Sequence, residues 1–263
     1  MQAIRFKKIN SFNVVFLFVS SLLLLFIFAP ILGIYIKTST LDIFRASIDK
    51  EVHESIQLTL AISAISTLLF SILAIPFAYY LARHDFMFKS VLLGLINLPI
   101  VIPHTAAGIA LLGFINRDTL VGKFGEMLGL NFIGTSAGIM IAMAFVSVPF
   151  LINAAYNGFK EVPERIENAA YTLGATKWQA FFKISLPLAW RSIVSGGVMM
   201  FARGISEFGA VVIIAYHPMT APVLIYERFT SFGLKYSQPV AALFILISLI
   251  VLIMFLYTSR KNK

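Results

Sequence analysis

Apolar residues in this chain gather in long runs that contain almost no charge. Five runs of more than twenty residues hold no Asp, Glu, Lys or Arg, and a sixth, 192–226, is interrupted by only Arg203 and Glu207. A helix needs ~20 apolar residues to cross the ~30 Å hydrocarbon layer of a membrane. Each run is therefore long enough for one crossing. The predicted spans are 13–36, 56–82, 91–115, 133–157, 190–216 and 238–258.

The composition points to the same class of protein. Hydrophobic residues make up 59% of the chain and charged residues only 13%, about half the ~25% usual in soluble domains, and the mean hydropathy is +0.89. Backbone groups in lipid must be satisfied within their own segment, which favours helices here because the runs lack the alternation of barrel strands. We therefore expect an all-α integral membrane protein with one domain, 1–263. The chain has no cysteine, which excludes disulfides and Cys-ligated metals.

Basic residues are distributed unequally between the two sides of the predicted membrane. One side holds thirteen Lys and Arg, from both termini and the second–third and fourth–fifth connections, and the other side holds seven, balanced by seven acids. Positive charge is retained in the cytoplasm, so both termini and connection 158–189 are expected there. The net charge of +9 then reflects membrane topology and not binding to nucleic acid.

Connection 158–189 predicts two short helices outside the bilayer. Pro163 suits the start of the first, and Gly174 suits the residue just past its end. The spacing i, i+3, i+4, i+7 gives this helix one apolar face, formed by Ile166, Ala169, Ala170 and Leu173. Thr176 and Gln179 form a capping-box pattern that starts the second helix.

Three partners could cover that apolar face: the lipid headgroup layer, the rest of the chain, or a cytoplasmic protein. Small alanines together with Glu164 and Glu167 suit a protein cleft better than anionic lipid.

Ala169-Ala170, Gly174 and the later Ile184-x-Leu186-Pro187 resemble the EAA loop of ABC-importer permeases. The resemblance implies a cytoplasmic coupling helix between spans four and five that docks into a groove of an ATP-binding subunit. Asn168 stands at the position of the family's glutamate and Glu167 stands one residue earlier, so either could make the charged contact. The implied coupling residues are Glu164, Ile166, Glu167, Asn168, Ala169, Ala170, Leu173 and Gly174.

Two further stretches, LPIVIPHTAAGIALL (98–112) and FARGISEFGAVVIIAYHP (201–218), look like the permeases for tetrahedral oxyanions, most of all the archaeal-type molybdate/tungstate permeases. Sulfate or another oxyanion is the alternative substrate. The resemblance implies a homodimer with two cytoplasmic ATP-binding subunits and an extracytoplasmic oxyanion-binding protein. ATP and Mg²⁺ would be bound by the partner, with no cofactor on this chain.

Other classes of function fit the sequence less well. The chain has no G-x-x-x-x-G-K-[ST] loop to hold ATP phosphates, and we expect no catalytic residue and no metal site in it. An ion-gradient-driven transporter or channel would need no coupling helix and often shows inverted repeats, of which we find no convincing example.

Polar residues inside the spans have two interpretations each. Arg203 and Glu207 are four residues apart, so they could pair to fix helix packing, or Arg203 could attract a passing anion. Pro99 and Pro103 each remove a helix hydrogen bond and should kink the third span. His104 beside the kink is expected to bond a freed carbonyl, with a gate role as the alternative.

The hydroxyls of Thr59, Ser63 and Ser66 could bond to carbonyls of their own helix or line a path. Ser206 belongs to a stripe of small residues that could allow close helix packing or line the path.

Overall fold

The structure, a computed structural model, describes residues 11–261, which form helices joined by short connections and contain no strand. The long helices are α1 (Ser11–Lys37), α3 (Lys50–Arg83), α7 (Ser136–Glu161), α10 (Leu186–Ile205) and α13 (Leu234–Lys261). The shorter helices are α2 (Thr40–Ile48), α4 (Lys89–Val101), α5 (His104–Ile115), α6 (Leu120–Met127), α8 (Glu164–Thr172), α9 (Lys177–Ala180), the π-helix η1 (Phe181–Ser185), α11 (Gly209–Ile214) and α12 (Ala221–Phe232).

Five stretches are long and apolar enough to cross a membrane, and α4 with α5 gives a sixth if the bent pair is one span. The five are Phe12–Lys37, Lys50–Arg83, Ser136–Glu161, Lys177–Ile205 and Leu234–Met254. The prediction of an all-α, multi-pass membrane protein is therefore confirmed.

The third predicted span, 91–115, is bent as expected, and the bend divides it into two helices, α4 and α5. The chain bends by 111° between α4 and α5. Pro103 removes a backbone donor and disfavours a helical conformation at the residue before it, and Ile102 has an extended ψ of 148°. Pro99, also expected to kink the helix, lies inside α4.

The fifth predicted span differs from expectation. In place of 190–216, the helical stretch begins at Lys177, passes through η1 and ends at Ile205. The chain then breaks, because the Glu207 carboxylate accepts a hydrogen bond from the Ala210 backbone N–H at 2.8 Å and α11 starts afresh at Gly209.

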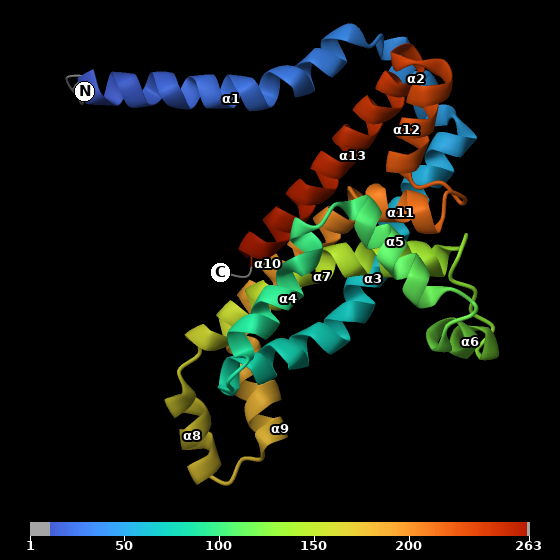
Figure 1. The fold of residues 1–263 in the computed structure, drawn as a ribbon. Coiled ribbons are helices and arrows are strands. Elements are labelled where there is room, and N and C mark those ends of the chain that lie inside the picture. Colours follow the sequence, from blue (N-terminus) through green and yellow to red (C-terminus); the bar gives the residue numbers. More distant parts are fainter. Residues whose placement is uncertain (1–10, 262–263) are drawn as a thin grey trace.

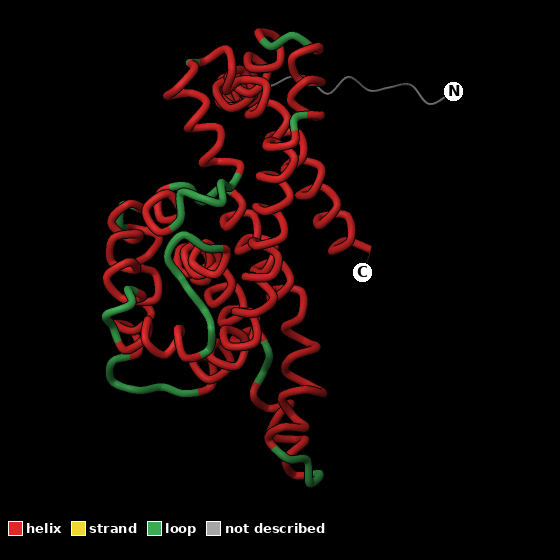
Figure 2. Tube along the Cα trace, turned by 90° about the vertical axis from the view of Figure 1, so that its right-hand side faces the viewer, coloured by secondary structure: helices red, strands yellow, loops and turns green. Residues whose placement is uncertain are grey.

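The centre of the molecule is a bundle of α3, α7 and α10, with α13 alongside (Figure 1). α1 projects away from this bundle, while α8 and α9 form a hairpin at the end opposite α2 and α12, as Figure 2 also shows from the side. The hairpin thus lies at one extremity of the fold.

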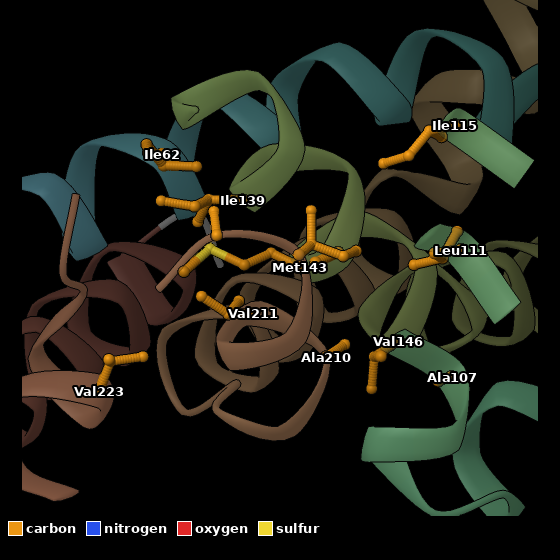
Figure 3. Close-up of a cluster of buried hydrophobic side chains, with 13 residues drawn as sticks. Ile62, Ala107, Leu111, Ile115, Ile139, Met143, Val146, Ala210, Val211 and Val223 are labelled. Carbon is orange, nitrogen blue, oxygen red and sulfur yellow. The ribbon is translucent and has the colours of Figure 1, made fainter. Parts of the chain in front are cut away.

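Part of the core lies where α5, α7 and α11 meet (Figure 3). Met143 and Val146 of α7 are buried there against Ala107 and Val211. Close approach depends on small residues: a Cβ on Gly108 would lie 2.9 Å from Ala210 Cα. The two broken helices are in this way packed tightly against each other.

Two ion-pair clusters sort the connections into the two groups that the charge pattern predicted. Arg228 of α12 lies 2.8 Å from Asp49 and 3.0 Å from Glu51, which joins the first–second to the fifth–sixth connection. The ion pair of Arg83 and Glu167 joins the connection between the second and third spans to the connection between the fourth and fifth spans. The basic residues of the N-terminus, Arg5, Lys7 and Lys8, and Lys263 lie outside the described residues.

Candidate functional site

The α8 helix ends through the glycine that the sequence singled out. Gly174 has a φ of +85°, a conformation that is unstrained only for glycine. Its N–H donates to Tyr171 O and the N–H of Ala175 donates to Ala170 O, both at 3.0 Å. These two bonds satisfy carbonyls at the helix end as a Schellman motif. The predicted end of the helix is confirmed, as is the capping box of Thr176 and Gln179 that starts α9.

The predicted apolar face of α8 is not covered by the rest of the described chain. Leu173 is 88% exposed and Ile166 39% exposed, while Ala169 is exposed and Ala170 half-buried. Glu164 and Asn168 are exposed as well. Packing of this face on the described part of the chain, residues 11–261, is therefore excluded, and an outside partner or the headgroup layer remains.

Glu167, by contrast, points inward and is buried. Its carboxylate accepts hydrogen bonds from Arg83 Nε at 2.9 Å, Tyr79 Oη at 3.0 Å and Ser185 Oγ at 2.6 Å. Burial raises the pKa of this carboxyl, but the hydrogen bonds from Arg83 and Ser185 and the charge of Arg83 lower it more, so the net pKa lies below its ordinary value. The sequence left open whether Glu167 or Asn168 contacts the ATP-binding subunit. Glu167 is buried and paired with Arg83 of the same chain, whereas Asn168 is exposed.

Sequence reasoning missed Arg83, which it counted only as a positive charge that sets topology. Arg83 ends α3, 84 residues before Glu167, and no local pattern connects the two. A search for a basic residue at the end of each span opposite a buried acid could have raised the possibility.

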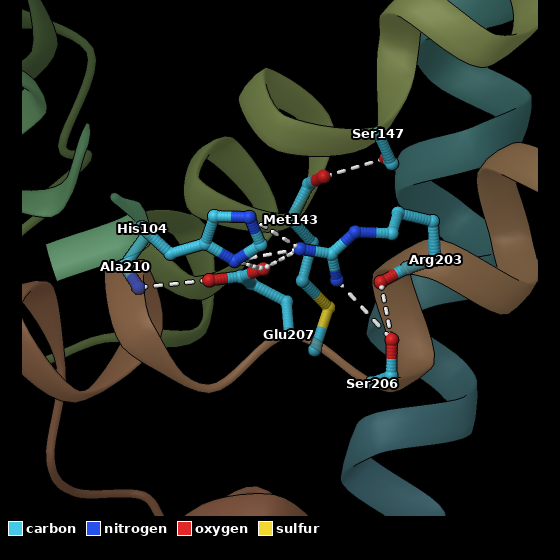
Figure 4. A network of polar contacts seen from close by, with 7 residues as sticks. All are labelled: His104, Met143, Ser147, Arg203, Ser206, Glu207 and Ala210. Carbon is cyan, nitrogen blue, oxygen red and sulfur yellow. Dashed lines mark hydrogen bonds and ion pairs between the residues drawn. The ribbon is translucent and has the colours of Figure 1, made fainter. Parts of the chain in front are cut away.

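A second polar cluster lies where the two helix breaks meet (Figure 4). Arg203 Nη2 is 2.8 Å from Glu207 Oε2, and His104 Nδ1 is 2.9 Å from the same oxygen. Arg203 Nη1 also donates to Ser206 Oγ at 3.2 Å. Glu207 is fully buried, whereas 21% of the Arg203 side chain and 33% of the His104 side chain are exposed.

Two expectations about this cluster need correction. His104 does not bond a carbonyl freed by Pro103; it contacts Arg203 Nη2 at 2.6 Å together with Glu207. Glu207 pairs with Arg203 as expected, yet it does so from beyond the end of α10 and not from the same helix face. Beyond the end of α10, the Glu207 carboxylate lies between Arg203 of α10 and His104 of α5.

Chemically, this cluster pairs one carboxylate with one permanent cation and one imidazole. Arg203 and His104 keep part of their surface accessible, so a passing anion could touch them, while the buried carboxylate beneath limits how tightly it would be held. Packing and anion contact are both compatible with this geometry.

The hydroxyls of α3 join helices to one another. Thr59 Oγ1 donates to Ser55 O at 2.6 Å, as expected for bonding within its own helix, and accepts from Ala221 N at 2.8 Å. Ser63 and Ser66, however, donate to carbonyls of α10 and α7, at 2.9 Å to Phe201 O and 3.1 Å to Met140 O. All three are buried. Ser206, in contrast, lines an apolar groove of about 310 Å³ between α10 and α13.

Comparison with known proteins gives three kinds of similarity. The sequence model described as "Binding-protein-dependent transport system inner membrane component" matches residues 74–261. The chain is 44% identical over 228 residues, 87% of its length and 89% of the relative's, to the molybdate/tungstate transport system permease protein WtpB of Methanocaldococcus jannaschii. It is 41% identical over 243 residues, 91% and 93% of the two lengths, to that of Thermococcus kodakarensis.

More distant similarities are to proteins whose names give other substrates. A probable sulfate transport system permease protein, cysT, of Chlorokybus atmophyticus is 30% identical over 209 residues, 78% of this chain and 73% of that protein. In fold, the chain resembles a bacterial ABC transporter that imports the acidic polysaccharide alginate, with a TM-score of 0.73 at 16% identity, covering 95% of this chain and 96% of that one.

Proposed function

The chain belongs to the family of binding-protein-dependent transport system inner membrane components, and on this premise we propose that it is the permease subunit of an ATP-driven importer for molybdate or tungstate. The names of the relatives that are 41–44% identical over most of both chains support this substrate. The chain supplies the conduit. ATP and Mg²⁺ are bound and ATP is hydrolysed by a separate subunit.

The observation that carries the proposal is α8, a short helix with an uncovered apolar face at one extremity of the fold. A helix that lays such a face into a groove of a partner uses residues at i, i+3, i+4 and i+7. In the proposal, Ile166, Ala169, Ala170 and Leu173 enter the groove of the ATP-binding subunit, Glu164 and Asn168 flank it, and Gly174 ends the helix.

The complete importer is a homodimer of this chain with two cytoplasmic ATP-binding subunits and an extracytoplasmic oxyanion-binding protein. The five long stretches and the bent pair α4–α5 make six spans, both termini are cytoplasmic, and α8 is the coupling helix between the fourth and fifth spans. The excess of Lys and Arg in the connections on the α8 side supports this orientation.

Transport follows from movement of α8. ATP closes the paired ATP-binding subunits, α8 moves with them, and the helices of the two permease subunits pass from an inward-open to an outward-open arrangement. The anion released by the binding protein then enters, and hydrolysis resets the cycle. A conduit needs weak contacts with its substrate. We assign Arg203, Glu207 and His104 mainly to packing between the two helix breaks, and the same to Thr59, Ser63 and Ser66.

Sulfate or another oxyanion is the second candidate substrate, favoured by the similarity to a probable sulfate permease. A transporter driven by an ion gradient is a weaker alternative, because it gives α8 no partner.

The test is reconstitution of the chain in vesicles with its ATP-binding subunit and its binding protein. We expect tungstate or molybdate on the binding protein to stimulate ATP hydrolysis and uptake, and sulfate to do so less. Uptake without any ATP-binding subunit would overturn the proposal. Stimulation by sulfate alone would replace the substrate but keep the importer.

A further inference from the structure

Glu167 is the only residue of α8 that is buried. Its side chain is 5% exposed, and that of Arg83 is 8% exposed. The other residues of α8 lie on the surface or are half-buried, so the carboxylate of Glu167 is the principal anchor of α8 to the remaining chain.

The anchor reaches several elements at once. Arg83 at the end of α3 and Tyr79 one turn earlier donate to Glu167, and so does Ser185 at the end of η1, where α10 begins. Arg83 also donates from Nη1 to Phe159 O at 2.8 Å and from Nη2 to Val162 O at 3.1 Å. These two carbonyls belong to the end of α7, where helices leave carbonyls without partners. One guanidinium therefore joins α3, α7 and α8.

Aromatic rings enclose this cluster. The rings of Tyr79 and Phe159 have centroids 5.2 Å apart and those of Tyr79 and Phe181 4.9 Å apart, both in edge-to-face geometry. The hydrogen bonds between Arg83 and Glu167 are charge-assisted, and such bonds fix the orientation of both partners. The surrounding rings limit the access of water. The contact between Arg83 and Glu167 is therefore rigid, whereas the rest of α8 is only loosely held by the described chain.

We propose that Arg83 and Glu167 form the joint through which α8 moves the ends of α3, α7 and α10 as one body. The inference rests on the proposed function, in which an ATP-binding subunit displaces α8 through its exposed face. Arg83 is a positioning residue: it touches neither substrate nor partner, and it acts by holding Glu167. Without the joint, α8 follows the ATP-binding subunit while the three helices lag behind.

The first experiment measures coupling in the complete reconstituted importer. Glu167→Gln keeps the size of the side chain and removes its charge, and Arg83→Gln removes the guanidinium with a shorter side chain. Glu161→Gln removes an exposed acid at the end of α7 and is the control. We expect the variants to bind the ATP-binding subunit and hydrolyse ATP, while tungstate transported per ATP falls about tenfold. Glu161→Gln keeps the wild-type ratio, and Glu167→Asp, which retains the charge, restores part of the loss.

The second experiment measures the joint directly and does not depend on transport. The chain has no cysteine, so spin labels can be placed at Met87→Cys beyond α3 and Thr172→Cys on α8, both exposed positions. We expect one narrow distance in the complex with and without ATP, and a broad distribution in Glu167→Gln.

If the charge variants fail to assemble, Tyr79→Phe and Ser185→Ala each remove one hydrogen bond from a neutral donor to Glu167. These two variants are expected to lower the coupling ratio less. A wild-type ratio and a narrow distance in every variant that assembles would overturn the joint. A wild-type complex that moves no oxyanion would overturn the proposed function instead, and the distance measurement would still decide the joint.

Discussion

His104 Nδ1 lies 2.9 Å from Glu207 Oε2, and this contact ties the break between α4 and α5 to the break between α10 and α11. A Cβ on Gly209 would lie 2.7 Å from His104 Cβ, so the two breaks approach each other as closely as a glycine permits. The polar cluster and the two helix breaks therefore depend on each other, since one break supplies His104 and the other supplies the Glu207 carboxylate that it contacts.

Removing Glu207 alone is expected to destabilise the protein. Glu207→Leu leaves Arg203 without its carboxylate at a buried site, which costs ~3–5 kcal/mol when one partner of a buried pair is lost, and the Ala210 N–H loses its acceptor. Glu207→Gln keeps an acceptor and should cost less. Thermal unfolding in detergent measures both variants.

The double variant Arg203→Leu/Glu207→Leu separates packing from anion contact. If the pair serves packing, the double change recovers much of the stability lost by either single change, because no unpaired charge remains. A double variant that folds and assembles but does not transport would assign Arg203 to the anion path.

Charge on the apolar face of α8 should prevent docking of the ATP-binding subunit. Leu173→Asp places a carboxylate at a position that is 88% exposed in this chain, so the isolated permease should unfold at the same temperature as the wild type. Burying an unpaired charge in the partner's groove opposes binding. Co-purification measures the complex, with Thr172→Asp on another face as the control. Normal co-purification of Leu173→Asp would contradict the docking assignment.

Cysteine labelling tests the orientation. Trp178 is 73% exposed and Lys50 is exposed at the start of α3, so single cysteines at these positions should react with an impermeant thiol reagent. We expect label at position 50 in intact cells and at position 178 only after the membrane is opened. Label at position 178 in intact cells would reverse the topology and remove the docking argument with it.

The stability of the protein should depend on the charge of Glu167 in acid. Its folded-state pKa lies below the ordinary value of 4.5, so its contribution to stability is complete above that value and is lost as pH falls through the lower folded-state pKa. Unfolding temperatures should therefore drop as the pH falls below 4.5, and the drop should be smaller in Glu167→Gln. Parallel curves for the two proteins would show that another carboxyl sets the acid limit.

Features that depend on residues close together in the chain were predictable from the sequence. The long uncharged runs gave the membrane helices, the Thr176–Gln179 pair gave a helix start, and Gly174 gave a helix end with a φ of +85°. The apolar face of α8 also followed from spacing alone. Each of these signals acts within a turn or two of helix, or over the length of one hydrophobic run, so no knowledge of the packing is needed to read it.

The helix breaks were only partly predictable. Pro103 predicts a disturbed helix, since it removes a hydrogen bond. It does not predict the bend of 111°, which depends on how α5 packs against α11. The break at Ser206 has no proline or other local signal. It exists because the Glu207 carboxylate finds Ala210 N–H, Arg203 and His104 together.

By itself, the sequence determined that this protein is helical and lies in a membrane, and that it exposes a short amphipathic helix between two of its spans. Tertiary structure decided which charges meet: Arg83 with Glu167 across 84 residues, and His104 with Arg203 across 99. The physical reason is that burying a charge is favourable only with a partner in good geometry, and that partner is supplied by the packing of distant helices, which no local pattern encodes.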